Sequence, residues 1–135
     1  MNHSEHPIIR LMQADHRYKL EAYQLVRDAL AYAQDVLELG SVSQESEAGE
    51  RHLTGQELCH ALRLLAIEQF GFMAHTVLKS WGIHSTSDIG EIVYNMIEVG
   101  LMRKSANDRR EHFNNVFDFE EAFEREFEIS VPKTV

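Results

Sequence analysis

The chain has 135 residues, a net charge of −9 and 44% hydrophobic residues, a composition typical of one globular domain with one core. Both halves are acidic when the chain is divided at Ile67, so no basic half is reserved for nucleic acid. Cys59 is the only cysteine, which excludes an intramolecular disulfide. No apolar run approaches the length of a membrane span, so we expect a cytoplasmic protein without membrane association.

The first part of the chain contains one long predicted helix between polar segments. Residues 1–7 are polar and are expected to be loose, and the short apolar run 8–12 predicts one helical turn. Apolar residues at alternating spacings of three and four then predict a helix over residues 18–39, ended by Gly40. The polar segment 41–51 predicts an exposed loop and is too short to mark a domain boundary.

The middle of the chain is divided into three shorter predicted helices, over residues 55–70, 72–81 and 88–99. Thr54 and Glu57 have the spacing of a capping box, which predicts where the first of these helices begins. Asp88 predicts the cap of the third. Each helix is followed by a glycine, the residue that most readily adopts the left-handed backbone of a helix end: Gly71, Gly82 and Gly100.

The pattern after Gly100 leaves two alternatives open. Residues 101–104 and 115–117 form the two strands of a hairpin, or the whole piece is one helical turn and a loop. Asp118 and Glu121 then predict the cap of a last helix, over residues 119–127 and followed by a loose tail over 128–135.

The predicted fold class is therefore mainly α: a compact single-domain helical fold over residues 1–135, with a small β-hairpin as the alternative after Gly100. With that hairpin, residues 54–118 follow the order of a winged helix-turn-helix.

Five motifs between residues 18 and 123 resemble an uncharacterised family of small conserved bacterial proteins, found mainly in planctomycete and verrucomicrobial genomes. In chain order the motifs are HLTGQEL, ALRLLAIEQFG, VLKSWGI, DIGEIVYNMIEVGLM and VFDFEEAF. The resemblance implies the same helix boundaries and transfers no activity, substrate or catalytic residue. It also implies a loose pattern at Cys59 and His60, which argues against a metal or thiol role for them.

DNA binding is the functional candidate that the helix order suggests. In a winged helix-turn-helix the third helix enters the major groove and the hairpin flanks it. The predicted wing is locally basic, and its nucleic-acid candidates are Arg103, Lys104, Arg109 and Arg110. The predicted reading helix, however, carries three acidic residues and no Lys or Arg. Because phosphate contacts dominate DNA affinity, this charge disfavours nucleic acid as a partner.

A metal site has weak candidates in His52, Glu57 and His60. Glu57 and His60 have the i, i+3 spacing of carboxylate-bridged di-iron bundles, but the sequence contains no second Glu-x-x-His motif. His52 lies eight residues before His60, outside the usual zinc spacings, and one cysteine cannot build a thiolate site. We therefore expect no metal and no other cofactor.

Catalysis has no motif to support it, because the sequence lacks a nucleophile elbow, a P-loop and a dinucleotide fingerprint. Trp81, next to the helix-ending Gly82, is expected to pack in the core against the long first helix; if exposed, it becomes a candidate for partner binding.

The predicted function is a non-catalytic acidic interaction or structural module with a protein partner, or a homodimer. The alternative is a winged-helix-like DNA-binding regulator, and a metal protein or enzyme comes third.

Overall fold

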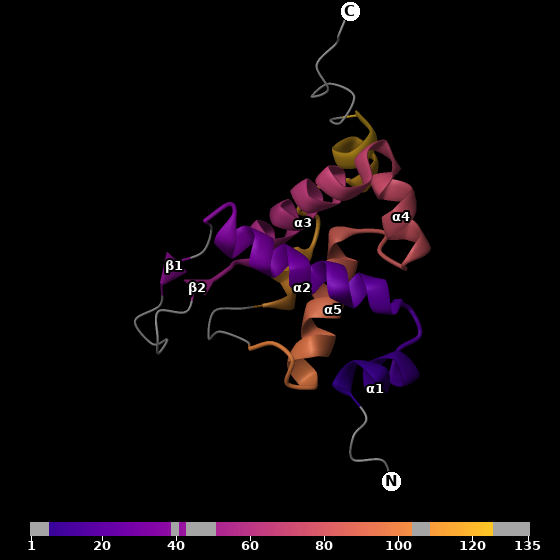
Figure 1. Cartoon of the computed structure of the whole chain (residues 1–135), viewed down its shortest axis with the longest axis vertical. Helices are drawn as coiled ribbons and strands as arrows, with labels where there is room; N and C mark the ends of the chain where they lie inside the picture. Colours follow the sequence, from indigo (N-terminus) through magenta and orange to yellow (C-terminus); the bar gives the residue numbers. More distant parts are fainter. Residues whose placement is uncertain (1–5, 39–40, 43–50, 104–108, 126–135) are drawn as a thin grey trace, which may run out of the picture.

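The computed structural model describes residues 6–38, 41–42, 51–103 and 109–125, and these residues are mainly helical (Figure 1). The α-helices are α1 (Pro7–Ala14), α2 (Leu20–Asp35), α3 (Gly55–Phe70), α4 (Ala74–Ser80) and α5 (Thr86–Glu98). The shorter elements are the antiparallel pair β1 (Ser41–Val42) and β2 (Arg51–His52), the 3-10 turns η2 (Gly71–Met73) and η3 (Arg110–Phe113), and the π-helical turn η4 (Glu121–Arg125). Among the described helices, none is both long and apolar enough to cross a membrane.

In the view of Figure 1, helix α2 crosses in front of α3 and α5, and it packs against both. The wide apolar face predicted for it is confirmed over most of its length, with six fully buried positions: Ala22, Tyr23, Leu25, Val26, Ala29 and Ala33. The helix ends at Asp35, earlier than predicted, and Val36 is 62% exposed. The apolar pattern therefore continues for one turn beyond the part of α2 that its neighbours cover. Gly40, the predicted stop, lies outside the described residues.

Helix α3 has the predicted bounds, because its capping box forms. The Thr54 hydroxyl accepts a hydrogen bond from the backbone N–H of Glu57 at 3.0 Å, and the Glu57 carboxylate accepts one from the N–H of Thr54 at 2.9 Å. These two bonds satisfy donors that an uncapped helix end would leave open. At the other end, Gly71 has a φ of 57° and turns the chain out of the helix.

The next two helices differ from the prediction at their first turns. The segment predicted as one helix over 72–81 begins as the 3-10 turn η2, and α4 starts only at Ala74. Helix α5 begins at Thr86, two residues before the predicted cap. The reason is that Asp88 acts from inside the first turn, where its carboxylate accepts the backbone N–H groups of His84 at 2.9 Å and Ser85 at 3.2 Å.

Of the two alternatives after Gly100, the described residues show bends and a helical turn. Residues 101–103 and 109–118 contain no strand where the structure describes them, and η3 occupies the place of the expected hairpin. A winged-helix arrangement is therefore not confirmed. The only strand pairing described joins β1 to β2, in the segment predicted to be a plain loop. The predicted last helix is helical as far as the structure describes it, with residues 119–120 α-helical and residues 121–125 forming the π-helical turn η4; residues 126 and 127 lie outside the described part.

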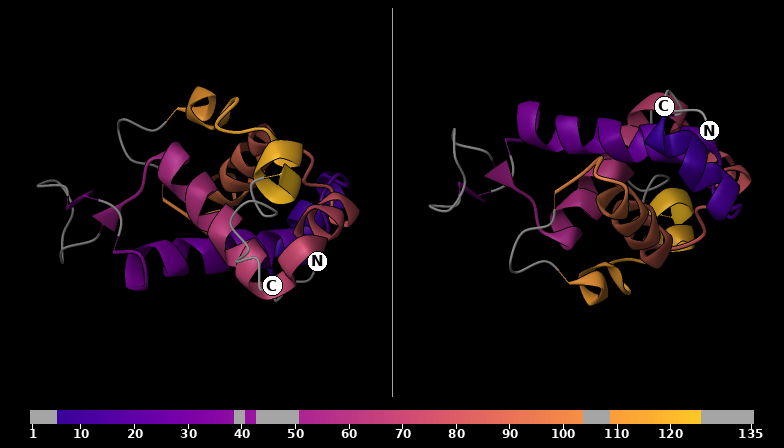
Figure 2. Two further views of the ribbon diagram at one scale, coloured as in Figure 1. Left: turned by 90° about the horizontal axis from the view of Figure 1, so that it is seen from above. Right: turned by 90° about the horizontal axis from the view of Figure 1, so that it is seen from below.

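Two glycines explain why η3 packs so closely on the helices. A Cβ at Gly90 of α5 would lie 2.7 Å from the Cβ of Phe113, and a Cβ at Gly55 of α3 would lie 3.1 Å from the Cβ of His112. At Gly90 only a residue without a side chain leaves room for that approach, and at Gly55 a Cβ would make a tight contact. In both views of Figure 2, α2 runs along one edge of the molecule and residues 110–113 lie at the opposite edge.

The junction between the start of α2 and helix α5 is held by polar contacts. The hydroxyl of buried Tyr18 donates to the Asp88 carboxylate at 2.6 Å. The Asn95 side-chain amide donates to Asp15 at 3.0 Å and to the hydroxyl of Tyr23 at 3.2 Å. The backbone of Gly82 lies close to the carbonyl oxygen of Arg17, so close that a Cβ at Gly82 would collide with it. We call this group, residues 15–18, 23, 82, 88 and 95, the closed junction.

Candidate functional site

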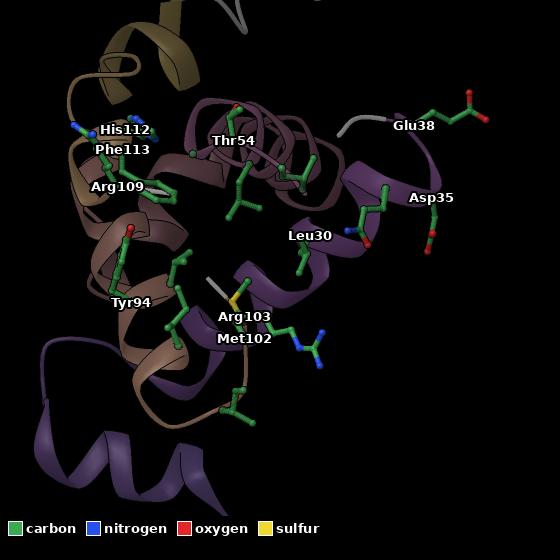
Figure 3. Close-up of a pocket in the computed structure, with 17 residues that line it drawn as sticks. Leu30, Asp35, Glu38, Thr54, Tyr94, Met102, Arg103, Arg109, His112 and Phe113 are labelled. Carbon is green, nitrogen blue, oxygen red and sulfur yellow. The ribbon is translucent and has the colours of Figure 1, made fainter. Parts of the chain in front are cut away.

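A cleft of about 800 Å³ opens between the end of α2, the start of α3 and the segment that follows α5 (Figure 3). Clefts of roughly 300–1,000 Å³ are the usual size for sites that bury a small ligand or a few side chains of a partner. The cleft is lined by Leu30, Gln34, Asp35, Glu38, Leu53, Thr54, Gly55, Leu58, Val93, Tyr94, Ile97, Leu101, Met102, Arg103, Arg109, His112 and Phe113. These residues come from four separate segments of the chain, so the cleft exists only in the folded protein.

The floor of the cleft is apolar. Leu58 and Val93 are core residues that also reach it, while Leu30 and Ile97 are only half-buried and leave apolar surface uncovered. Leu101 and Met102, in the bends after α5, extend the same surface. Burying such surface against a partner is favourable by about 25 cal/mol per Å². The floor can therefore supply binding energy to any partner with matching apolar side chains.

The rim of the cleft is acidic at one side and carries the cation of Arg109 at the other. Asp35 and Glu38 stand at the end of α2, and Arg109 and His112 stand on the far side, next to η3 (Figure 3). Asp35, Glu38 and Arg109 are exposed, and His112 is half-buried. Arg103 belongs to the same lining but comes from the bends after α5.

The structure places three of the four nucleic-acid candidates, and they have two kinds of surroundings. Arg103 and Arg109 line the cleft, whereas Arg110 lies 3.4 Å from the Glu91 carboxylate and stacks over the Tyr94 ring at 4.9 Å. Lys104 lies outside the described residues. The sequence thus singled out two of the cleft's cations, Arg103 and Arg109, but assigned them to a DNA-binding wing.

Helix α5, which was expected to read DNA bases, is enclosed by the rest of the molecule. Glu98 is the one exposed residue of Thr86–Glu98, and six residues are fully buried: Thr86, Ile89, Gly90, Ile92, Val93 and Met96. A recognition helix needs an open face to enter the major groove. Most of the helix packs in the core, and Val93, Tyr94 and Ile97 line one wall of the cleft.

The metal candidates make other contacts. The carboxylate of Glu57 is used in the capping box, and the His60 ring lies 5.5 Å from the ring of Phe117. The side chain of His52 is outside the described part of the structure. Within that part, no three His, Cys, Asp or Glu side chains lie together in a group that could hold a metal ion.

Cys59 and Trp81 are both packed against apolar surroundings. Burial raises the pKa of the Cys59 thiol to about 12, so little thiolate forms at neutral pH. Trp81 is half-buried, and its ring meets Phe70 edge-to-face at 5.5 Å. Its aromatic partner is therefore on α3, and Trp81 also packs against the core to which α2 contributes. The Trp81 carbonyl accepts the N–H of Lys19, at the start of the predicted first helix, at 3.2 Å.

Sequence reasoning did not find the cleft as a whole. The sequence pattern predicts only the end of an ordinary amphipathic helix around Leu30, Asp35 and Glu38. His112 lies in a polar stretch without periodicity. One signal was present: the apolar stripe of α2 continues into its exposed last turn at Val36. Comparisons with family models, curated proteins and solved structures gave no match, so the resemblance to the bacterial family stays a prediction.

Proposed function

We propose that this protein is a non-catalytic interaction module that binds a short segment of a partner protein in the cleft. The observation that carries the proposal is the combination of an apolar floor and a charged rim around about 800 Å³ of open space. Protein-binding sites commonly place apolar anchors at the centre and polar groups at the edge. A cleft of this size accepts a few side chains of a partner and not a whole domain.

The chemistry of the lining supports binding more than catalysis. Covalent catalysis requires a nucleophile within hydrogen-bond reach of a base. The cleft lining includes no cysteine or serine, and the hydroxyl of Thr54 is used in the capping box of α3. The one thiol of the chain, Cys59, is fully buried away from it. The single cysteine also fits a reducing compartment, and a cytoplasmic location remains part of the proposal.

DNA binding, a winged-helix role and a metal-dependent activity gain no specific support from the geometry. The enclosed helix α5 offers no reading face, and the Glu91 carboxylate lies beside Arg110. A homodimer is a special case of the proposal, in which a second copy of the chain supplies the bound segment.

The proposal is tested by selecting binders from a phage-displayed library of random short peptides. The variant Leu30→Trp places a larger side chain on the cleft floor. Its matched control is Leu64→Trp, on an exposed part of α3 that does not line the cleft. We expect selected peptides to bind the wild type, and Leu30→Trp to weaken them by about tenfold or more, or about 1.4 kcal/mol. Leu64→Trp should leave binding unchanged.

Thermal unfolding of both variants must first show that each one folds. A library that yields no binders, or binders that ignore Leu30→Trp, would overturn the proposal. Sedimentation of the wild type alone separates the homodimer case, since self-association that Leu30→Trp abolishes identifies a second copy as the occupant.

A further inference from the structure

We infer that the cleft binds a peptide segment of mixed charge in one orientation, with an acidic side chain beside Arg109 and His112 and a basic side chain beside Asp35 and Glu38. This inference rests on the proposed function and specifies the partner's chemistry. Between the two charged residues, the segment places apolar side chains on the floor formed by residues such as Leu30.

The side of the cleft that favours an anion is built around Arg109. Arg109 supplies a guanidinium, which is suited to paired hydrogen bonds with a carboxylate. His112, half-buried on η3, adds ring nitrogen atoms next to it. Thr54 and Gly55 bring the start of α3 into the same wall, where the capping box already pairs the N–H groups of Thr54 and Glu57.

The rigidity of this wall makes it a defined binding surface. His112 and Phe113 are set against Gly55 and Gly90 at distances that leave no free space for a Cβ on either glycine. The neighbouring Arg110 is held against Glu91 and Tyr94. Arg109, by contrast, lines the cleft and is exposed.

The opposite side favours a cation. Helix α2 ends there, with no basic residue in its last turn to offset its exposed carbonyl groups, and a helix C-terminus carries partial negative charge. Asp35 and Glu38 both belong to this side of the lining, and their side chains point in different directions (Figure 3). Glu38 has a φ of 53°, the left-handed conformation that turns the chain away from the helix axis. At this side, side-chain charge and helix dipole therefore have the same sign.

The two sides together define the occupant. A wholly acidic peptide would meet Asp35 and Glu38, and a wholly basic one would meet Arg109, so either would lose at one side what it gained at the other. A neutral apolar peptide would fill the floor but leave both sides of the rim with water alone. A mixed-charge segment satisfies the floor and both sides of the rim at once.

The experiment uses three pools of synthetic short peptides with randomised apolar centres and fixed charges at their ends. One pool is acidic at both ends, one is basic at both ends, and the third carries one charge of each sign in both orders. We expect the mixed pool to supply the tightest binders and one order of charges to prevail. Added salt should weaken them, since the rim charges are exposed to solvent.

Charge reversal identifies which side each end contacts. With the best mixed peptide, Arg109→Glu should weaken binding about tenfold, and replacing the acidic residue of the peptide by Lys should recover part of that loss. Asp35→Lys should respond in the same way to replacement of the basic residue by Glu. Two exposed positions outside the cleft provide matched controls, Arg10→Glu and Asp28→Lys, and should leave binding unchanged.

The outcomes separate the inference from the proposed function. If all three pools bind equally well and Leu30→Trp still blocks them, the cleft is a peptide site but the charge assignment is wrong. If mixed peptides bind and the rim reversals change nothing, the inference is also overturned. If neither the pools nor the random library yields binders, the proposed function fails with it.

Discussion

The two ends of helix α2 use polar residues in opposite ways. At its start, polar side chains pair with one another in the closed junction, and the neighbouring α2 residues Ala22 and Tyr23 are fully buried. At its end, Asp35 and Glu38 stand at the rim of the cleft, around an apolar floor that is only half-covered. The first arrangement stabilises the fold, and the second leaves charge and apolar surface available to a partner.

In the closed junction, burial and hydrogen bonding change the pKa of Tyr18. Burial, followed by the hydrogen bond to Asp88, raises the pKa of Tyr18 well above its ordinary value of 10.0. Because the folded state resists losing that proton, this part of the stability is complete below pH 10 and is lost as the pH rises above it. Substitutions in the closed junction and around the cleft test this difference between the two ends of α2, and their expected effects on stability decrease from Gly82 to Arg109.

Gly82→Ala should cause the largest loss of stability. The new Cβ would collide with the carbonyl oxygen of Arg17, at a residue whose φ is 97°. We expect a loss of at least roughly 3 kcal/mol, from backbone strain of about 1–2 kcal/mol and from overpacking. Thermal or urea unfolding measures it. Gly100→Ala is the control, because Gly100 also has a positive φ, 83°, but no atom lies within 4 Å of its added Cβ. Equal losses at the two glycines would mean that contact with Arg17 contributes nothing.

Asp88→Ala should cost roughly 2–4 kcal/mol. It leaves the buried hydroxyl of Tyr18 without its acceptor, at about 1–3 kcal/mol, and removes the acceptor for the backbone N–H groups of His84 and Ser85. Tyr18→Phe removes only the first of these interactions, so its loss should be smaller. The two substitutions should be non-additive in a double-mutant cycle, and strictly additive losses would show that the hydrogen bond is not stabilising.

Thr54→Ala should cost about 1 kcal/mol, because it removes one of the two hydrogen bonds of the capping box. Glu57→Ala should cost less, and the pair should be non-additive in urea unfolding. Thr54 tests the comparison from the other side, because it lines the cleft and yet has a structural partner. A negligible loss of stability would mean that the Thr54 side chain does not stabilise the fold, as is expected for the exposed residues at the rim.

The sequence predicts the parts of this fold that depend on local chemistry. The capping box at Thr54 and the positive φ at Gly82 and Gly100 follow from spacing and residue type, and the structure confirms them. The segment after Gly100 could not be predicted, because its conformation depends on Gly90 and Gly55 of helices distant in the sequence. The cleft is harder still, since its charges act together only after four segments meet.

Asp15→Asn should have a smaller effect than the caps, and one that depends on pH. Hydrogen bonds from the Arg17 guanidinium, the closest at 2.7 Å, hold the pKa of Asp15 well below its usual value of 3.8. The stability from this ionisation is present above about pH 4 and is lost as the pH falls further. Since Arg17 is mostly exposed, we expect Asp15→Asn to lower the free energy of unfolding by roughly 0.5–1 kcal/mol at pH 7. Urea unfolding at pH 7 and pH 2 should show the variant losing less stability than the wild type on acidification; equal losses would contradict this assignment.

Arg109→Ala should have the smallest effect on folding, within about 0.5 kcal/mol of the wild type. Its side chain is exposed at the rim of the cleft, so truncation exposes no core and leaves no buried group without a partner. Arg110→Ala is the paired measurement, because the same change one residue later removes the contacts with Glu91 and Tyr94. We expect thermal unfolding to show the greater loss for Arg110→Ala, and the affinity for mixed-charge peptides to show the greater loss for Arg109→Ala. The reverse order would mean that Arg109 stabilises the fold and does not bind the peptide. The residues at the end of α2 would then pair within the protein, as those at its start do. The expected order would separate two adjacent arginines into one that stabilises the wall and one that the wall presents to a partner.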